Sequence, residues 1–280
     1  MLSYRHSFHA GNYADVLKHL VQIRVLRYLS KKPKPFCYLD THAGAGGYSL
    51  TGEHANKTQE YLDGVARLWE LEDLPEPLQD YLQVIKEFNR SDKLTHYPGS
   101  PAIAAALTRK EDKLWLYELH PTDFKILRQE VANQRRIRCE QSDGFKGAIA
   151  KLPPLERRGM VLIDPPYELK EDYQRCAETL IKAHRKFSTG CYALWYPVVD
   201  RNRIDQLERK LVDSGIRNIQ LFELSQTDDS DAFGMTSAGM IVINPPWTLH
   251  KEMKACLPLL ADKLGSNGQG NYRCEVLVPE

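Results

Sequence analysis

Seven short runs of apolar, β-branched and aromatic residues recur along the chain, and each is typical of a buried strand. Segments with helical spacing separate the first five runs. In residues 170–187, for example, Tyr173, Ala177 and Leu180 fall on one helical face. This alternation predicts a largely parallel sheet with helices on both sides. The seven runs cover residues 36–40, 114–118, 136–141, 160–164, 192–198, 219–224 and 240–244.

The last two runs are connected differently from the first five. Residues 225–239, which lie between them, are polar, contain glycine and show no apolar periodicity. A crossover helix is therefore not expected there, and an antiparallel hairpin with a long loop fits better. Five alternating units followed by an antiparallel pair are typical of the Rossmann-like class I methyltransferase fold. We therefore predict an α/β fold with a seven-stranded, mostly parallel sheet and an antiparallel last strand.

Two helices can be located from the pattern of their residues. Residues 12–31 predict a long amphipathic helix with a broad apolar face. Lys18 and His19 interrupt this face, so they are candidates for a functional role at one end of the helix. The helix that crosses from the first strand to the second is expected to begin at Ser100 and Pro101, with the serine as N-cap.

The connection before that crossover helix is longer than a plain crossover needs. It holds helical patterns over residues 58–71 and 76–89. We interpret residues 52–98 as an inserted helical subdomain beside the cofactor site. Residues 1–51 and 99–280 would then form the methyltransferase core.

Composition narrows the class of protein without deciding its partner. The chain has 280 residues, 42% of them hydrophobic and 27% charged, which suits one large globular domain. It has no run of about eighteen apolar residues and no apolar segment near its start, so neither a membrane span nor a signal peptide is predicted, and we expect a cytoplasmic protein. The six cysteines are scattered, so neither disulfides nor structural zinc is expected. A net charge of +1 leaves a nucleic-acid partner open, because 38 Lys and Arg residues could still gather on one face.

A candidate nucleoside-cofactor site follows the first three predicted strands. Asp40 ends the first strand and runs into H-A-G-A-G-G, where Gly44 would let the backbone approach a ligand, although the same letters suit a plain tight turn. Glu118 ends the second strand, where a carboxylate can accept hydrogen bonds from ribose hydroxyls, or could simply be a solvated residue before a helix. After the third strand, Asp143 can accept from an adenine amine, cap a helix, or both, while Gly144 gives room for the ring.

The fourth strand ends in D-P-P-Y at the carboxyl edge of the sheet, where ligands bind. The amine of adenine is a poor nucleophile because its lone pair is delocalised into the ring. Asp164 and the Pro165 carbonyl can each accept one amine N–H, and Tyr167 offers an aromatic face to an extruded base. A Pro-Pro turn that merely ends the strand would explain neither the acid nor the tyrosine. A second motif, N-P-P-W from Asn244, follows the last strand, and we interpret it as a strand end far from the methyl group.

Together, the D-P-P-Y motif, the H-A-G-A-G-G loop and the opening Y-R-H-S-F-H-A-G-N-Y-A-D-V-L-K-H resemble the bacterial 23S ribosomal RNA adenine-N6 methyltransferases of the RlmJ type over the whole chain. The resemblance implies an enzyme that uses S-adenosylmethionine. Direct methyl transfer requires no metal, and we expect a monomer. Its partner would be 23S ribosomal RNA, naked or in early large-subunit assembly, methylated near the peptidyl transferase centre. The resemblance further implies that Tyr4, His6 and Lys18 contact the target adenine or its neighbours. It implies that the cofactor is held by His19, His42, Ser100, Glu118, Asp143, Gly144 and Asp164.

Two other functions stay open at the level of the residues alone. The same D-P-P-Y chemistry would suit a DNA adenine methyltransferase, although no separate recognition segment is evident after the catalytic strand. The second alternative is a non-catalytic protein that binds RNA on a methyltransferase fold. The intact glycine loop and D-P-P-Y residues disfavour this alternative. Without the resemblance, residues 4–9 would be a frayed, slightly basic terminus.

Overall fold

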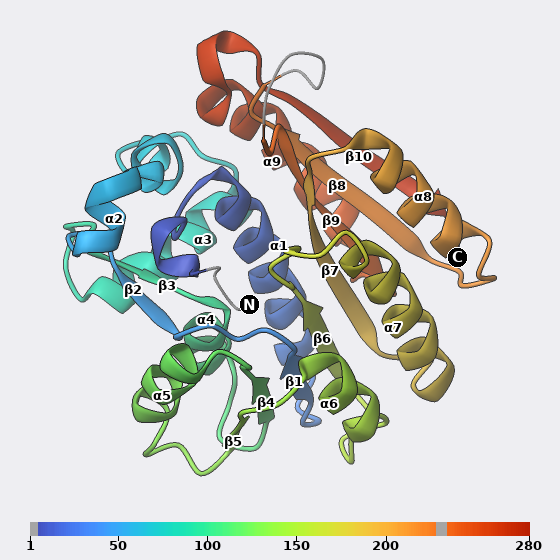
Figure 1. Ribbon diagram of the computed structural model, residues 1–280. Helices are drawn as coiled ribbons and strands as arrows, with labels where there is room; N and C mark the ends of the chain where they lie inside the picture. The colour runs from blue at the N-terminus through green and yellow to red at the C-terminus, as the bar shows by residue number, and fades with distance from the viewer. Residues whose placement is uncertain (1–4, 228–233) are drawn as a thin grey trace.

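An eight-stranded sheet forms the centre of the computed structural model, which describes residues 5–227 and 234–280. The strand order is β10-β8-β9-β7-β6-β1-β4-β5 (Figure 1). Each of the seven predicted runs forms one of these strands to within a few residues. The strands are β1 (Cys37–Asp40), β4 (Lys113–Tyr117), β5 (Ile137–Glu140), β6 (Gly159–Ile163), β7 (Cys191–Val198), β8 (Ile219–Ser225), β9 (Ser237–Ile243) and β10 (Asn271–Val278).

Strand directions match the predicted fold class, whereas the predicted strand count is wrong. β5, β4, β1, β6 and β7 run parallel, and β9 lies antiparallel between β7 and β8. The eighth strand, β10, pairs antiparallel with β8 at the edge of the sheet. Most of its side chains are exposed or half-exposed, so it has no continuous apolar run to reveal it. The parallel strands bring the carboxyl ends of β1, β4 and β6 to one edge.

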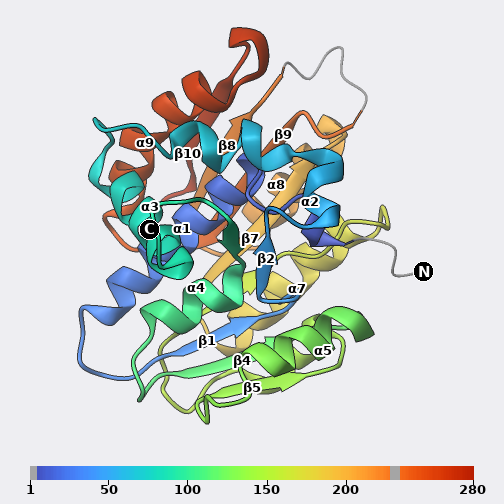
Figure 2. The same ribbon diagram turned by 90° about the vertical axis from the view of Figure 1, so that its left-hand side faces the viewer.

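Helices cover both faces of the sheet, as predicted (Figures 1 and 2). Side chains of α1, α4, α5 and α9 share one hydrophobic cluster, and those of α6, α7 and α8 share another. Alternate residues of the central strands serve the two clusters; Ala193 belongs to the first and Leu194 to the second. The helices are α1 (Tyr13–Ser30), α4 (Ser100–Leu107), α5 (Pro121–Glu130), α6 (Gly144–Lys151), α7 (Asp172–Lys186), α8 (Arg201–Val212) and α9 (Leu249–Leu264).

The predicted N-terminal helix, α1, lies between the sheet and other helices. Its cap is Asn12, whose side chain accepts a hydrogen bond from the Asp15 backbone N–H at 2.9 Å. Contacts with α3, α4, α9 and the strands bury it on nearly all sides. The polar residues Lys18, His19 and Gln22 are buried with it and therefore need polar partners.

The long connection between β1 and β4 packs against α1. It contains α2 (Glu53–Thr58), the 3₁₀ helices η2 (Glu60–Asp63) and η3 (Val65–Leu68), and α3 (Glu76–Asn89). Two short strands, β2 (Gly47–Ser49) and β3 (His96–Pro98), pair at its base. The helix predicted for residues 76–89 is confirmed. The one predicted for 58–71 is wrong, because Gln59 adopts a left-handed φ of 52° and the chain turns again at Gly64.

Within the described parts of the chain, no helix has the length and apolar character needed to cross a bilayer. All six cysteines are free thiols. No three His, Cys, Asp or Glu side chains among the described residues are grouped so that they could hold a metal ion.

Candidate active site

A cavity of about 300 Å³ lies at the carboxyl edge of β1, β4 and β6. All eight residues predicted to hold the cofactor line its wall, although they come from six separate segments of the chain. Pro165 and the two described residues predicted to contact substrate, His6 and Lys18, line it too. The eight residues are His19, His42, Gly44, Ser100, Glu118, Asp143, Gly144 and Asp164.

Two glycines let the loops of this wall approach one another closely. Gly44 has a φ of +61°, and a Cβ there would lie 2.3 Å from the Tyr48 hydroxyl. A Cβ on Gly144 would lie 1.8 Å from the backbone carbonyl oxygen of Thr41. The glycine loop is also tied to β4, because the Gly44 N–H donates to Glu118 Oε2 at 2.7 Å. The cavity therefore has a compact wall that larger residues would disrupt.

Acidic side chains occupy the ends of the second and third predicted strands. Both oxygens of Glu118 accept backbone N–H groups, from Gly44 at 2.7 Å and from His120 at 2.6 Å, and burial raises the pKa of this carboxyl. Asp143 caps α6, where its Oδ1 accepts from the N–H groups of Phe145 at 3.0 Å and Lys146 at 3.2 Å. The predicted capping role of Asp143 is thus confirmed.

The other oxygen of Asp143 forms an ion pair with Arg175 of α7. The Arg175 guanidinium also lies 4.3 Å from the centre of the Phe145 ring. Arg175 lines the cavity but was not among the residues predicted from the sequence. It brings a positive charge to the end of the cavity that contains Asp143.

A buried carboxylate, Asp40, lies behind the cavity wall. Its Oδ2 accepts hydrogen bonds from the hydroxyls of Tyr38 and Ser100, each at 2.7 Å. Burial raises the pKa of Asp40 to about 6 despite these two donors. The prediction that Ser100 is an N-cap is wrong, because Gly99 occupies that position and the Ser100 hydroxyl is directed to Asp40 instead.

Two histidines of the cavity wall are held in the neutral form. Burial lowers the pKa of His42 to about 3 and that of His19 well below its usual value. His19 Nδ1 lies 2.8 Å from the Tyr97 hydroxyl, whereas its buried Nε2 has no hydrogen-bond partner within the described residues. An unpaired buried ring nitrogen on a cavity-lining residue is free to bond a ligand.

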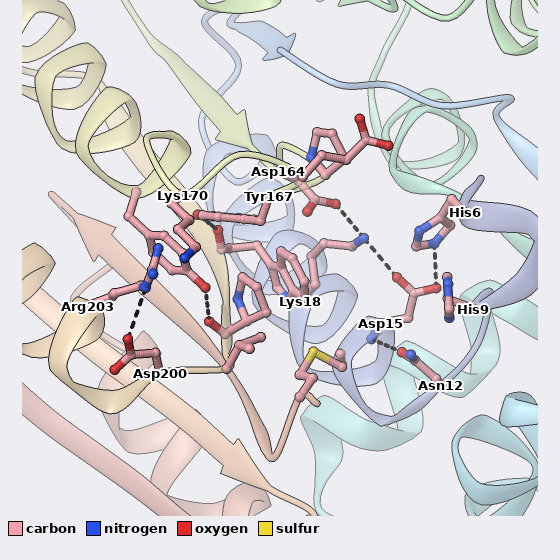
Figure 3. Close-up of a pocket in the computed structure, with 18 residues that line it drawn as sticks. His6, His9, Asn12, Asp15, Lys18, Asp164, Tyr167, Lys170, Asp200 and Arg203 are labelled. Atoms are coloured by element: carbon pink, nitrogen blue, oxygen red, sulfur yellow. Dashed lines mark hydrogen bonds and ion pairs between the residues drawn. The ribbon is translucent and has the colours of Figure 1, made fainter. Parts of the chain in front are cut away.

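A second cavity of about 400 Å³ adjoins the first (Figure 3). Both are lined by His6, Lys18, Asp164, Pro166 and Glu168, so the two spaces meet at the D-P-P-Y segment. The second cavity also has an aromatic wall made of Tyr167, Tyr173 and Trp195.

Tyr167 is fixed in an unusual backbone conformation on that wall. Its φ is +50°, which is uncommon for a residue other than glycine and is often found at functional sites. Its hydroxyl donates to the Trp195 carbonyl at 2.7 Å. Its ring centre lies 4.6 Å from that of Tyr173 and 5.9 Å from that of Trp195. The aromatic wall is therefore anchored before any ligand arrives.

Asp164 lies at the junction of the two cavities and faces Lys18 (Figure 3). Lys18 Nζ lies 2.7 Å from Asp164 Oδ2, and the Asp164 side chain stays 16% exposed. Asp164 Oδ1 has no hydrogen-bond partner among the residues described. The ion pair thus uses one oxygen of the carboxylate and leaves the other available to a ligand.

Lys18 is held from its other side by Asp15, three residues earlier on α1. The Lys18 Nζ to Asp15 Oδ1 distance is 2.8 Å, and His6 Nε2 lies 2.9 Å from Asp15 Oδ2. Burial alone would raise the pKa of Asp15, but the nearby His6 and Lys18 hold it well below its usual value. Burial alone would lower the pKa of Lys18, but the two carboxylates raise it above its ordinary value. The lysine therefore stays charged while almost fully buried.

The remaining predicted positions lie as follows. Tyr4 is outside the described residues. Asn244 of the second motif lies at the opposite edge of the sheet, where its side chain donates to the Ser188 and Gly190 carbonyls at 2.7 and 2.8 Å, just before β7 begins. It lines neither cavity, as the strand-end interpretation requires.

Several cavity residues were not predicted from the sequence. Tyr173 and Trp195 lie within predicted elements, but nothing in their local pattern distinguishes them from ordinary core aromatics. Asp15 had a detectable signal, because it lies one helical turn before Lys18 and an acid at that spacing can pair with it.

The strand order, with ligand-sized cavities at the carboxyl edge of the parallel strands, is that of the class I methyltransferase fold. A family model described as "Ribosomal RNA large subunit methyltransferase D, RlmJ" matches residues 33–278. The chain belongs to this family, as its sequence motifs indicated.

Two curated relatives carry a name of the same kind, and one solved structure is similar to this chain over almost its whole length. The chain is 54% identical over 280 residues to "Ribosomal RNA large subunit methyltransferase J" of Escherichia coli, and 100% of each chain is covered. It is 48% identical over 281 residues to the protein of the same name from Haemophilus influenzae, again covering 100% of both. The crystal structure of a Legionella pneumophila protein superposes with a TM-score of 0.89 at 39% identity, covering 96% of this chain and 98% of that one.

Proposed function

We propose that the protein transfers the methyl group of S-adenosylmethionine to N6 of an adenine in 23S ribosomal RNA. The observation that carries the proposal is the junction of two cavities at Asp164, one suited to a nucleoside cofactor and the other walled by aromatic rings. The names of the two curated relatives, which call them large-subunit ribosomal RNA methyltransferases, support RNA as the substrate.

The first cavity fits S-adenosylmethionine, which supplies an electrophilic methyl group on a sulfonium. Glu118 would accept hydrogen bonds from the ribose, since each carboxylate oxygen has capacity beyond its one backbone donor. Asp143 would meet the adenine end of the cofactor, with Gly144 giving room for the ring. The unpaired Nε2 of His19 would bond a polar group of the cofactor, as would His42 of the glycine loop.

The second cavity would receive the target base, extruded from its RNA context. Tyr167 would stack on the base. The free Oδ1 of Asp164 and the Pro165 carbonyl would each accept one N–H of the amine, which favours the pyramidal nitrogen needed for attack. Lys18 would orient the Asp164 carboxylate through their ion pair, and His6 would border the base. Fixed acceptors and in-line alignment then lower the barrier to direct transfer.

We further propose that the target is methylated on naked or partly assembled 23S RNA near the peptidyl transferase centre, by a monomer acting in the cytoplasm. Residues 52–98 would form an inserted subdomain on a core of residues 1–51 and 99–280. Their buried Val65, Leu78 and Ile85 share a cluster with α1, which supports a role in holding α1 against the cofactor cavity.

Asp164→Ala is the variant that tests the proposed chemistry. We expect methyl transfer to a 23S transcript to fall by about 100-fold or more, the scale on which preorganised polar contacts act. Circular dichroism should show an unchanged fold. Asp213→Ala, at the exposed C-terminal end of α8, is the matched control and should keep the wild-type rate. Wild-type rates in Asp164→Ala would contradict the assignment.

A further inference from the structure

The edge of the sheet opposite the two cavities is strongly basic. Five connections enter the parallel strands there, and we call them together the basic edge. They contain fourteen Lys and Arg residues against three Asp and Glu residues, whereas the whole chain has 38 against 37. The positive charge of this nearly neutral protein is thus concentrated at one edge, which is a typical electrostatic footprint of nucleic-acid binding. The basic edge comprises residues 31–36, 109–113, 134–138, 151–158 and 185–190.

Most of these cations are not neutralised by the protein itself. In the basic edge, ion pairs within the described residues are limited to Arg109 with Asp112, Lys110 with Glu111, and Lys151 with Glu140. The other eleven have no carboxylate within 4.0 Å among those residues, and most are exposed. These eleven are Lys31, Lys32, Lys34, Lys113, Arg135, Arg136, Arg138, Arg157, Arg158, Arg185 and Lys186.

Helix dipoles explain only part of this charge. Helices α1, α6 and α7 end at this edge, and their C-termini favour nearby cations such as Lys31, Lys151 and Lys186. Lys113 begins strand β4, and Arg135 and Arg138 lie before and within strand β5, so no helix C-terminus accounts for them. The presence of these three basic side chains at one edge therefore needs another explanation.

A groove of about 480 Å³ lies within the basic edge. Lys113, Arg135, Arg138 and Lys151 line it together with Trp115. The Lys151 ammonium lies 3.5 Å from the centre of the Trp115 ring, so this cation is already held over an aromatic face. A groove with cations along its sides and an aromatic ring suits the phosphate backbone of a nucleic acid.

The groove is too far from Asp164 to serve the target nucleotide. Lys113, which lines the groove, begins β4, and Glu118 of the first cavity follows five residues later, about 17 Å along an extended strand. On α1, Lys31 lies thirteen positions after Lys18, about 20 Å along the helix axis. Figure 2 shows the connection from α1 to β1 on the side of the molecule away from the start of α1. Any RNA bound here must be a part of the substrate other than the methylated base.

We propose that the basic edge is a second RNA-binding surface, which contacts the backbone of ribosomal RNA outside the segment that enters the active site. The inference rests on the proposed function, in which ribosomal RNA is the substrate. It adds the surface to which the rest of that RNA binds. It implies that a long ribosomal RNA binds more tightly than a short fragment that carries the same adenine. The contacts are electrostatic, so the additional affinity depends on salt.

The test is the triple variant Lys113→Gln/Arg135→Gln/Arg138→Gln, whose side chains are exposed and unpaired within the described structure. The matched control, Lys93→Gln/Lys251→Gln/Lys254→Gln, removes the same charge from exposed positions outside the basic edge. Binding of a full-length 23S transcript and of a short hairpin that carries the methylated adenine is measured by filter binding across a salt series. Methyl transfer to the hairpin is measured in parallel.

We expect the test variant to bind the full transcript about 5- to 100-fold more weakly at 0.1 M salt, corresponding to one to three lost phosphate contacts. Its log-log salt slope should fall by about 0.7 to 0.9 for each contact. Transfer to the hairpin should stay at the wild-type rate. Equal losses in the test and control variants, or an unchanged affinity and slope in the test variant, would overturn the proposal. Absence of transfer to either RNA by the wild-type protein would instead contradict the proposed function.

Discussion

Replacing Lys18 by methionine removes the ammonium group that lies between Asp15 and Asp164, at 2.8 and 2.7 Å, while keeping a side chain of similar length. The Lys18 side chain is only 5% exposed, so water cannot easily take its place. Removing one partner of a buried ion pair costs about 3–5 kcal/mol. Because His6 and the Gly11 N–H still contact Asp15, each at 2.9 Å, we expect a loss near the lower end, about 3 kcal/mol.

The loss of stability should depend on pH in a defined direction. Although burial alone would raise the pKa of Asp15, the nearby His6 and Lys18 hold it well below its ordinary value. In the wild type, Asp15 therefore stabilises the fold above its unfolded pKa of about 4, and this contribution is lost as pH falls further. In Lys18→Met the folded pKa of Asp15 moves back up. The difference in unfolding free energy between wild type and variant should therefore be largest above about pH 5 and should become smaller below about pH 4.

Urea unfolding between pH 7 and pH 3 measures the loss of stability and its pH dependence. Methyl transfer to a 23S transcript measures the activity of each variant. The double variant Asp15→Asn/Lys18→Met should regain part of the stability but not the activity, because Asp164 still lacks its orienting cation. Arg24→Met is the control. Arg24 pairs with Glu252 and Asp80 away from both cavities, so stability should fall while transfer continues. A loss below about 1 kcal/mol in Lys18→Met, with a gap that is constant across pH, would refute the reasoning.

Three further changes probe other parts of the site. Tyr167→Ala should raise KM for RNA by about 5- to 150-fold, which is equivalent to about 1–3 kcal/mol of base stacking. Steady-state kinetics at saturating cofactor measure this KM, and an unchanged value would show that the ring does not stack on the base. Gly144→Ala places a Cβ 1.8 Å from the Thr41 carbonyl oxygen, so calorimetry should show at least about tenfold weaker S-adenosylmethionine binding; wild-type affinity would contradict the close approach. Asp40 has a pKa raised to about 6 by burial, so its contribution to stability is full below its unfolded pKa of about 4 and is lost as pH rises through 6. Between pH 4 and pH 7, the unfolding free energy of Asp40→Asn should therefore rise by about 3 kcal/mol relative to that of the wild type. If the unfolding free energies of the two proteins instead change in parallel with pH, the pKa of Asp40 is not raised by burial.

The interior of the fold could be predicted from the sequence, because buried strands consist of continuous apolar runs. The edge strand β10 could not, since its exposed side chains break the run. The helix expected over residues 58–71 failed for a local reason, the left-handed turn at Gln59. Periodicity describes which faces are buried, but it does not reveal a backbone reversal at a residue other than glycine.

The candidate site was predictable wherever a residue ends a strand of the parallel sheet. Asp164, Glu118 and Asp143 come together because the topology brings strand ends to one edge. The pair of Lys18 with Asp164 spans 146 residues and has no local signal. The same is true of Arg175, which meets Asp143 only because α7 packs beside α6.

The central claim is that the amine of an adenine in ribosomal RNA is placed against Asp164 for methylation. Its most direct test is mass spectrometry of nucleosides from a 23S transcript treated with the protein and isotope-labelled S-adenosylmethionine. The account predicts that the label appears in N6-methyladenosine at a single position. Label in another nucleoside, on a ring nitrogen or on the ribose, would contradict it.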